Sequence, residues 1–299
     1  MGIRVNPDLY SIILNGVQVN TQQEQQALEQ VATGQKLNSL SDNPAAAASL
    51  VDLRMQSSSD TQYLQNISTL TGSLNVADSA LSSVVEALTT AQSVGVEGTD
   101  PSMNSSNLQA LAQQIQGIQQ DVMGLANTTY NGQYLFSGTA TTTQPYVTDA
   151  SSTSGVTYKG SLDSNSVEIS SGQAMPTSLP GSQIFSNTTN SVFQALQDLY
   201  TALSTNTNIP SATTEVQNAL SYVSTQQTFY GNSVDRLNNA QTFLTQEQTQ
   251  LTENESNTLD VNMATAVTNL SQTETTQQAL MEAGAQISQV NLFDYLPNT

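Results

Sequence analysis

The sequence predicts a mainly α-helical protein, in which N- and C-terminal arms form a long antiparallel helical bundle or coiled coil with a small β-containing domain inserted in the middle. Two observations carry this prediction. Both arms repeat apolar residues at steps of three and four, the period of one helix face. The middle of the chain loses that period in a stretch rich in Ser, Thr, Gly and Pro. That stretch can turn the chain back, so the second arm can pair with the first.

The first predicted helix carries a coiled-coil pattern and ends at Gly34. Alternating steps of four and three select seven positions, five of them apolar or aromatic: Tyr10, Leu14, Val17, Thr21, Glu24, Leu28 and Val31. A second helix should start at residues 41–44, because Asp or Asn caps helices and Pro suits the first helical position. The residues of this helix-start motif are Ser41, Asp42, Asn43 and Pro44.

The next two predicted helices belong to the bundle. The longer one follows a heptad pattern and should end near Gly95 and Gly98; its pattern positions are Leu50, Leu53, Ser57, Asp60, Leu64, Ile67, Thr71, Leu74, Asp78, Leu81, Val85 and Leu88. The second has an apolar residue at every position of its pattern: Leu108, Leu111, Ile115, Ile118, Val122 and Leu125. We expect these last six side chains to be buried where residues 45–126 pack against 190–256.

The insert is predicted from short β-like runs separated by Gly-containing turns: residues 134–136, 145–147, 156–158 and 167–169. It should contain antiparallel strands and project from the side of the bundle. Deleting it should leave the bundle folded, because the seams of the bundle lie elsewhere. Three aromatic residues, Tyr130, Tyr134 and Phe136, are expected in the core of the insert, with a sugar-binding platform as the alternative.

Helical periodicity returns in the second arm. One short helix carries Val192, Leu196, Leu199 and Leu203, and a long one runs from Val216 to Leu251. A final helix begins near Leu259 and carries an apolar stripe at Leu280, Ala283, Ile287 and Val290. We therefore divide the chain into an N-terminal assembly helix and turn (1–43), two bundle halves (44–133 and 191–256), an outer domain (134–190) and a C-terminal assembly helix (257–299).

The composition argues against several function classes. The net charge of −19, with 5 basic residues, disfavours binding to nucleic acid and to anionic membranes. The chain has no His and no Cys, so it lacks the usual catalytic triads, zinc, haem and iron–sulfur ligands, and disulfides. Glu253 and Glu255 are too close in sequence to share a helix face, and Asp260–Asn262 lacks the rest of a calcium loop. We expect no enzyme, no cofactor and no metal site.

The order of several motifs resembles the bacterial flagellin superfamily. Residues 28–38 followed by Ser41–Ala45 resemble its N-terminal signature, with mild departures at Gln35, Lys36 and Asn43. Residues 125–138 resemble the segment that leads into the outer domain of a hook-associated member. Residues 260–264, 278–280 and 287–296 are similar to the end of that member, and a flagellin-type Leu/Ser-rich tail is absent. The resemblance covers residues 1–138 and 190–296.

The resemblance implies a structural protein of the bacterial flagellum that forms the junction between hook and filament by axial self-assembly. Its implied partners are itself in an axial ring, the proximal hook-associated junction protein, flagellin, and an export chaperone at the C-terminal helix. It also implies an extracellular place on the flagellum, reached without a cleaved signal peptide. Without the resemblance, the lack of a membrane-spanning run and of a recognisable signal peptide would favour the cytoplasm. Flagellin itself, a secreted coiled-coil adhesin and a carboxylate-based hydrolase are the alternatives.

The implied contact surface between subunits uses the apolar stripes of the first and last helices. These stripes lie outside the long central seams, and an isolated helix of this length is marginal in water. The expected inter-subunit residues are Tyr10, Leu14, Val17, Leu28, Val31, Leu280, Ile287, Val290, Leu292, Phe293 and Leu296.

Overall fold

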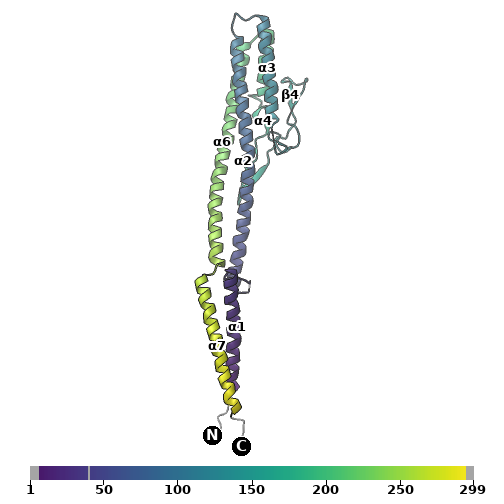
Figure 1. The fold of residues 1–299 in the computed structure, drawn as a ribbon. Coiled ribbons are helices and arrows are strands. Elements are labelled where there is room, and N and C mark those ends of the chain that lie inside the picture. Colours follow the sequence, from purple (N-terminus) through teal and green to yellow (C-terminus); the bar gives the residue numbers. More distant parts are fainter. Residues whose placement is uncertain (1–6, 40, 294–299) are drawn as a thin grey trace. The chain divides into compact units, whose positions relative to one another are not determined.

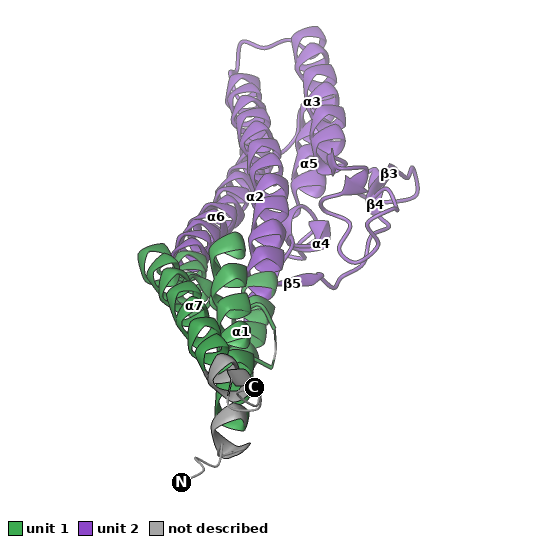
Figure 2. Ribbon diagram, turned by 60° about the horizontal axis from the view of Figure 1, so that its bottom comes forward, with its two compact units in different colours: residues 1–58, 247–299 green, residues 59–246 purple. Residues whose placement is uncertain are grey.

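The computed structural model describes the backbone of residues 7–39 and 41–293, and the side chains of residues 11–39 and 41–286. Long helices from both arms flank a few short strand pairs, as the sequence predicts (Figure 1). The chain divides into two compact units, coloured separately in Figure 2. Unit 1 contains residues 1–58 and 247–299, and unit 2 contains residues 59–246.

Unit 2 is a helical bundle with one continuous apolar core. It contains most of α2 (Pro44–Gly98) and α6 (Ile209–Leu259), which run in opposite directions, together with α3 (Ser105–Ala126) and α5 (Val192–Thr205). Helices α3 and α5 pack against each other, and all four contribute to the same buried cluster. Five of the six predicted α3 side chains are buried and Leu125 is half-buried. The prediction of a buried α3 face is therefore confirmed, with one residue at its edge.

The buried side chains of α2 agree with the predicted pattern only at every second position. At the positions between, the residue directly before the predicted one is buried. Eight residues hold an unbroken spacing of three and four: Ile67, Leu70, Leu74, Ala77, Leu81, Val84, Leu88 and Ala91. The predicted Thr71, Asp78 and Val85 are only half-buried. At these positions the fold instead buries Leu70, Ala77 and Val84, because the seam follows the neighbouring helices and not the heptad frame chosen from the sequence.

Gly95 does not end α2, which continues to Gly98. A Cβ placed at Gly95 would lie 2.4 Å from Thr213 Oγ1, so the missing side chain lets α2 and α6 approach closely. Gly95 therefore serves packing between helices, while the chain leaves the helix only after Gly98. Asn104 then starts α3 by accepting a hydrogen bond from the Asn107 amide at 2.9 Å.

The insert consists of three separate antiparallel hairpins. Strands β1 (Thr129–Tyr130) and β2 (Gln133–Tyr134) form the first, β3 (Tyr146–Thr148) and β4 (Val156–Tyr158) the second, and β5 (Ser166–Ser170) and β6 (Gln173–Pro176) the third. A short helix, α4 (Gly181–Ile184), follows. The first hairpin turns at Asn131 and Gly132, whose φ angles of 49° and 77° suit its two-residue turn.

The core of the insert is continuous with that of the bundle, contrary to our expectation that the bundle seams lie elsewhere. The Tyr146 ring lies 4.9 Å from Phe193 of α5 and 5.8 Å from Phe185, measured between centroids. Asn127, which directly follows α3, donates its side-chain amide to Tyr146 O and accepts from Tyr146 N, both at 2.9 Å. Deleting the insert would remove aromatic partners from α5 and expose the core.

Replacing Ile115 by alanine should reduce the free energy of unfolding by about 2–5 kcal/mol, because its fully buried side chain fills the centre of the α3 seam. Urea unfolding followed by helical circular dichroism measures the loss. The matched control is Gln116→Ala at the neighbouring exposed position, which should change the free energy by less than about 0.5 kcal/mol. Equal effects at both positions would contradict the assigned seam.

Replacing Tyr146 by alanine should destabilise the insert and the bundle together, by about 3 kcal/mol or more, because both share its ring contacts. Urea unfolding should retain a single transition when helical circular dichroism and tyrosine fluorescence are compared. The half-buried Tyr134 supplies the control, since Tyr134→Ala should cost less. Separate transitions for helix and tyrosine signals would show that the insert folds independently.

Candidate assembly interface

Unit 1 is built around an antiparallel pair of helices, α1 (Pro7–Thr33) and α7 (Met263–Phe293), shown in green in Figure 2. Two glycines, one on each helix, face an apolar side chain of the opposite helix at ordinary contact distance. A Cβ placed at Gly16 would lie 3.6 Å from Leu280 Cδ2, and one at Gly284 would lie 3.8 Å from Ile13 Cγ2. The pair therefore joins the first and last helices of the chain within one molecule.

The turns that flank this pair are hydrogen-bonded to each other. The Lys36 amide donates to Leu259 O at 2.6 Å, and the Val261 amide donates to Gly34 O at 3.0 Å. Gly34 has a φ of 71°, the left-handed conformation in which glycine commonly ends a helix. These bonds tie the end of α1 to the turn between α6 and α7.

The predicted helix-start motif lies at the start of α2. Asn43 Oδ1 accepts the Ala46 amide at 3.1 Å, and Pro44 is the first helical residue. Asp42 Oδ2 accepts the Ser39 amide at 2.8 Å, while Ser41 Oγ lies 2.7 Å from Ser39 Oγ. The motif folds the turn before α2 as well as capping the helix.

The α1–α7 pair buries few apolar side chains among its described residues. Of the side chains described in residues 11–33 and 263–286, only Asn20, Ala27 and Ala266 are fully buried. By contrast, Leu14 is 51% exposed and Leu28 is 57% exposed. Large apolar side chains of this helical pair are therefore left largely exposed in the single chain.

The structure divides the predicted contact residues into three groups. Val17, Val31 and Leu280 are half-buried at or near the seam, whereas Leu14 and Leu28 point outward. The remaining predictions concern side chains outside the described residues: Tyr10, Ile287, Val290, Leu292, Phe293 and Leu296.

Five further apolar residues are exposed, namely Ile12, Val19, Met263, Val267 and Met281. The periodicity pointed to core packing for Met263 and Met281, which is wrong, and it did not select the other three. Their signal was present as spacings of seven between Ile12 and Val19 and of fourteen between Val267 and Met281. Residues whole heptads apart share one helix face. Leu14 and Leu28, also fourteen apart, lie on a different face of α1 from Ile12 and Val19. Helix α1 therefore presents two separate apolar faces.

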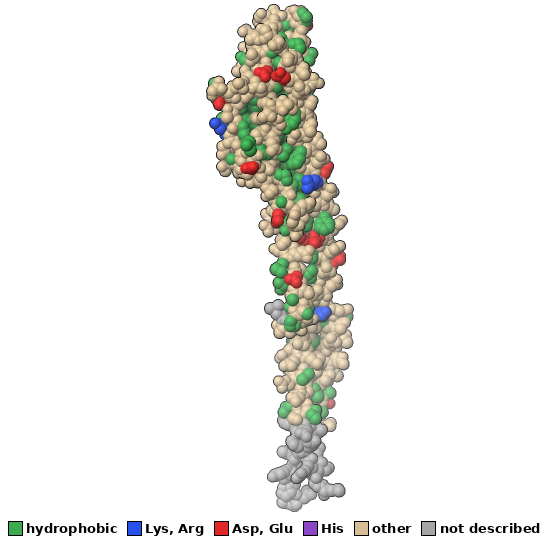
Figure 3. Space-filling model, turned by 180° about the vertical axis from the view of Figure 1, so that it is seen from behind, with side chains coloured by type: hydrophobic (Ala, Val, Ile, Leu, Met, Phe, Trp, Pro, Cys, Tyr) green, Lys and Arg blue, Asp and Glu red, His purple; other side chains and the backbone are tan. Residues whose placement is uncertain are grey.

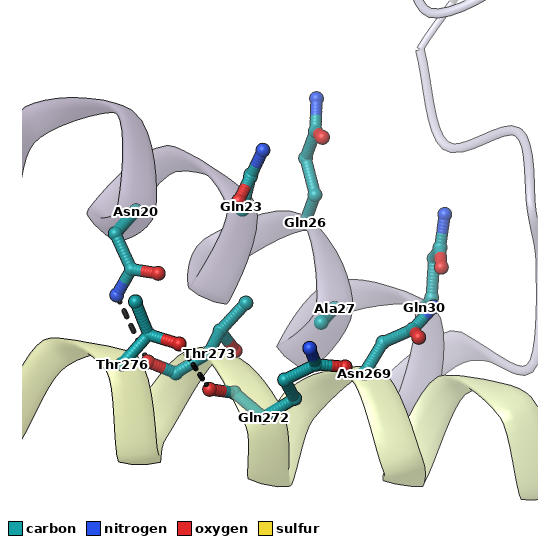
Figure 4. A pocket seen from close by; sticks show the side chains of 9 residues that line it. All are labelled: Asn20, Gln23, Gln26, Ala27, Gln30, Asn269, Gln272, Thr273 and Thr276. Carbon is teal, nitrogen blue, oxygen red and sulfur yellow. Dashed lines mark hydrogen bonds between the residues drawn. The ribbon is translucent and has the colours of Figure 1, made fainter. Parts of the chain in front are cut away.

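A polar groove of about 440 Å³ runs along the α1–α7 pair (Figure 4). Amide and hydroxyl side chains dominate its lining, which contains no charged residue: Asn20, Gln23, Gln26, Ala27, Gln30, Asn269, Gln272, Thr273 and Thr276. Uncharged polar surface also dominates the face of the molecule in Figure 3, where charged side chains are scattered. Arg54 Nε and Glu255 Oε1 form an ion pair at 2.9 Å, and neither residue lines the groove.

The carboxylate-based hydrolase receives little support from the described residues. The pKa of Glu215 on α6 is raised, first by burial and then by the charge and hydrogen bond of Asp198 on α5. Neither residue lines the pockets described in this part of the chain. Near the calcium-like segment, Asn262 Oδ1 instead accepts the amides of Ala264 and Thr265 at 3.1 and 3.3 Å, which caps α7.

A second pocket of about 450 Å³ lies in unit 2 between α2 and the insert. Tyr130 and Tyr134 line it and are half-buried, whereas Phe136 is fully buried in the core. The three predicted aromatic residues thus have different environments. Among the described residues, no helix combines the length and apolar content that crossing a membrane requires.

Comparison with known proteins identifies the class to which this fold belongs. Residues 8–141 match the bacterial flagellin N-terminal helical region, and residues 213–296 match the bacterial flagellin C-terminal helical region. Together these matches cover most of the chain, so the protein belongs to the bacterial flagellin family of structural flagellar proteins.

Within this family, the chain is similar to flagellar hook-associated protein 3 of Salmonella typhimurium, with 32% identity over 61% of this chain and 56% of the relative. It is less similar to flagellin B of Helicobacter pylori, with 27% identity over 56% of this chain and 32% of that protein. The chain thus spans little more than half of the length of the hook-associated relative and about a third of that of flagellin B. The fold resembles that of the flagellar junction protein FlgL from Legionella pneumophila, with a TM-score of 0.60, 13% identity, and coverage of 71% of this chain and 100% of that one.

Replacing Asn43 by alanine should reduce the free energy of unfolding by about 0.5–2 kcal/mol, because the Ala46 amide loses its side-chain acceptor. Thermal unfolding measures the loss. Asn43→Ser should restore most of it, because serine caps helices nearly as well. An alanine variant as stable as the parent would show that this cap contributes nothing.

Proposed function

We propose that this protein forms the junction between the flagellar hook and filament by axial self-assembly. The proposal is supported by family membership and by the relative named flagellar hook-associated protein 3. The observation that carries it is the exposure of apolar side chains on two separate faces of α1. The protein would act mechanically, as an adapter between the flexible hook and the stiffer filament, and not as an enzyme.

Two unlike faces suit a ring of identical subunits. In a head-to-tail assembly each subunit must offer one surface to the neighbour before it and a different surface to the neighbour after it. Leu14 and Leu28 supply one apolar face of α1, and Ile12 and Val19 supply another. Helix α7 adds Val267 and Met281 on a shared face of its own.

Coupled ordering would drive the assembly. Each exposed Leu, Ile or Met that becomes buried contributes about 1.5–3 kcal/mol before the cost of ordering. The described α1–α7 seam buries mainly small or polar side chains, so this pair gains little apolar burial alone. Neighbouring subunits would therefore add stability where the monomer has least.

The partners follow from the position at the junction. We propose that one end of the subunit ring contacts the proximal hook-associated junction protein and that the other end contacts flagellin. The protein would reach this extracellular site without a cleaved signal peptide. A cytoplasmic chaperone would cover the apolar face of α7, which includes Val267 and Met281, before export.

A filament subunit is the second candidate, because the chain is also similar to flagellin B. The two functions predict different positions on the flagellum. Antibody labelling of isolated flagella should mark one site where the hook ends if the protein is a junction component. Labelling along the whole filament would establish the flagellin function instead.

The double substitution Leu14→Glu with Leu28→Glu should abolish assembly and leave the monomer folded, because both side chains are already largely solvent-exposed. The monomer should melt within a few degrees of the parent, which corresponds to about 1 kcal/mol or less. Cells that carry only this variant should release flagellin into the medium without building filaments.

The matched control adds two negative charges at exposed polar positions of α3, outside both apolar faces of α1, as Gln113→Glu with Gln120→Glu. This variant should melt and assemble like the parent. A collapse of the melting temperature in the leucine variant would assign these residues to the monomer core. Normal filaments with the leucine variant would exclude this face of α1 from assembly.

A further inference from the structure

The α1–α7 seam contains a buried amide that is hydrogen-bonded to the opposite helix. Asn20 is only 5% exposed. Its Nδ2 atom donates to Thr273 O and to Gln277 Oε1, both at 2.9 Å. Gln277 in turn donates through Nε2 to Thr21 Oγ1 at 3.3 Å. Two residues of α1 are thereby joined to one turn of α7.

Apart from the turn bonds of Gly34 and Lys36, which anchor one end of the pair, the seam has few side chains that resist sliding. Leu280 contacts Gly16 and Ile13 contacts Gly284, both half-buried, and the other fully buried side chains of the described seam are the small Ala27 and Ala266. Such small residues interlock weakly, because register in paired helices normally depends on large side chains that fit between neighbours on the partner. Shape alone therefore specifies this register poorly.

The solvent-facing amides of the groove also discriminate poorly. Gln23 and Gln26 are exposed, so water can satisfy their side chains in any register. Asn20 differs, because a buried amide that loses its partners bears the full cost of desolvation. A single buried Asn in a helical seam is known to select one register at the expense of stability.

We propose that Asn20 fixes the register of the α1–α7 pair. A slip of one heptad displaces α7 along α1 by about 10.5 Å. That slip would separate Asn20 from Gln277 and change which apolar side chains of α1 and α7 lie beside one another. Asn20 is thus a positioning residue for the apolar side chains that α1 and α7 expose side by side. That these side chains form an assembly surface rests on the proposed function.

Engineered cysteine pairs can measure the register directly, because the chain contains no cysteine. Gly16→Cys with Leu280→Cys reports the observed register, since these positions are in contact. Gly16→Cys with Thr273→Cys reports a slip of one heptad. Each pair is introduced into the full chain with Asn20 retained or replaced by leucine, and treated with a short bifunctional thiol reagent.

With Asn20 present, the first pair should crosslink and the second should not. With Asn20→Leu, we expect crosslinking of the second pair to rise at least several-fold while helical circular dichroism is unchanged. Asn20→Ala, which adds no apolar bulk, should show the same loss of selectivity. Asn15→Leu adds an apolar residue at an exposed site of α1 and should leave the register unchanged.

Retention of the observed register in both Asn20 variants would overturn the proposal. Failure of the first pair to crosslink in the presence of Asn20 would also overturn it, because the network would then not hold the pair in the free chain. Neither result depends on assembly. Another outcome is that the register depends on Asn20 while cells with the Asn20→Leu variant still build normal flagella. In that case the register proposal stands and the assembly proposal fails.

Discussion

The continuous apolar core of unit 2 is the interaction on which the rest of the structure depends. It extends along α2 and α6 from the level of Ile67 and Leu244 to Gly98 and Ile209, and it includes α3 and α5. The aromatic contacts of Tyr146 and Phe185 with Phe193 join the insert to the same core. Bundle and insert are therefore one cooperative body, and the long helices can extend beyond it.

Unit 1, in contrast to unit 2, buries few large apolar side chains among its described residues. The described part of its α1–α7 pair is held by glycine contacts, an amide network and turns tied by backbone hydrogen bonds, with large apolar side chains outside. Such a pair has a defined geometry but little burial of its own. This combination suits a segment that gains most of its stability from neighbouring subunits, and it links the architecture to the assembly that we propose.

The candidate site was only partly accessible from sequence because a heptad pattern identifies apolar positions without identifying what covers them. Leu14 and Val17 belong to one predicted stripe, yet Leu14 is exposed and Val17 is half-buried. Asn20 falls between the positions of that stripe. Because it is also polar, an apolar pattern cannot select it. Its importance emerges only when Gln277, which is 257 residues away, comes within hydrogen-bonding distance.

By itself, the sequence determined the helical arms, the start of α2 at Pro44, the buried face of α3 and the family resemblance. Local periodicity, capping and motif order depend on residues that are near one another in the chain. Tertiary structure alone decided the buried row of α2, the role of Gly95 in close packing and the sharing of Tyr146 between insert and bundle. It also decided which face of α1 meets α7. Each of these depends on a partner distant in the chain, and a periodic pattern contains no information about the identity or the approach of that partner.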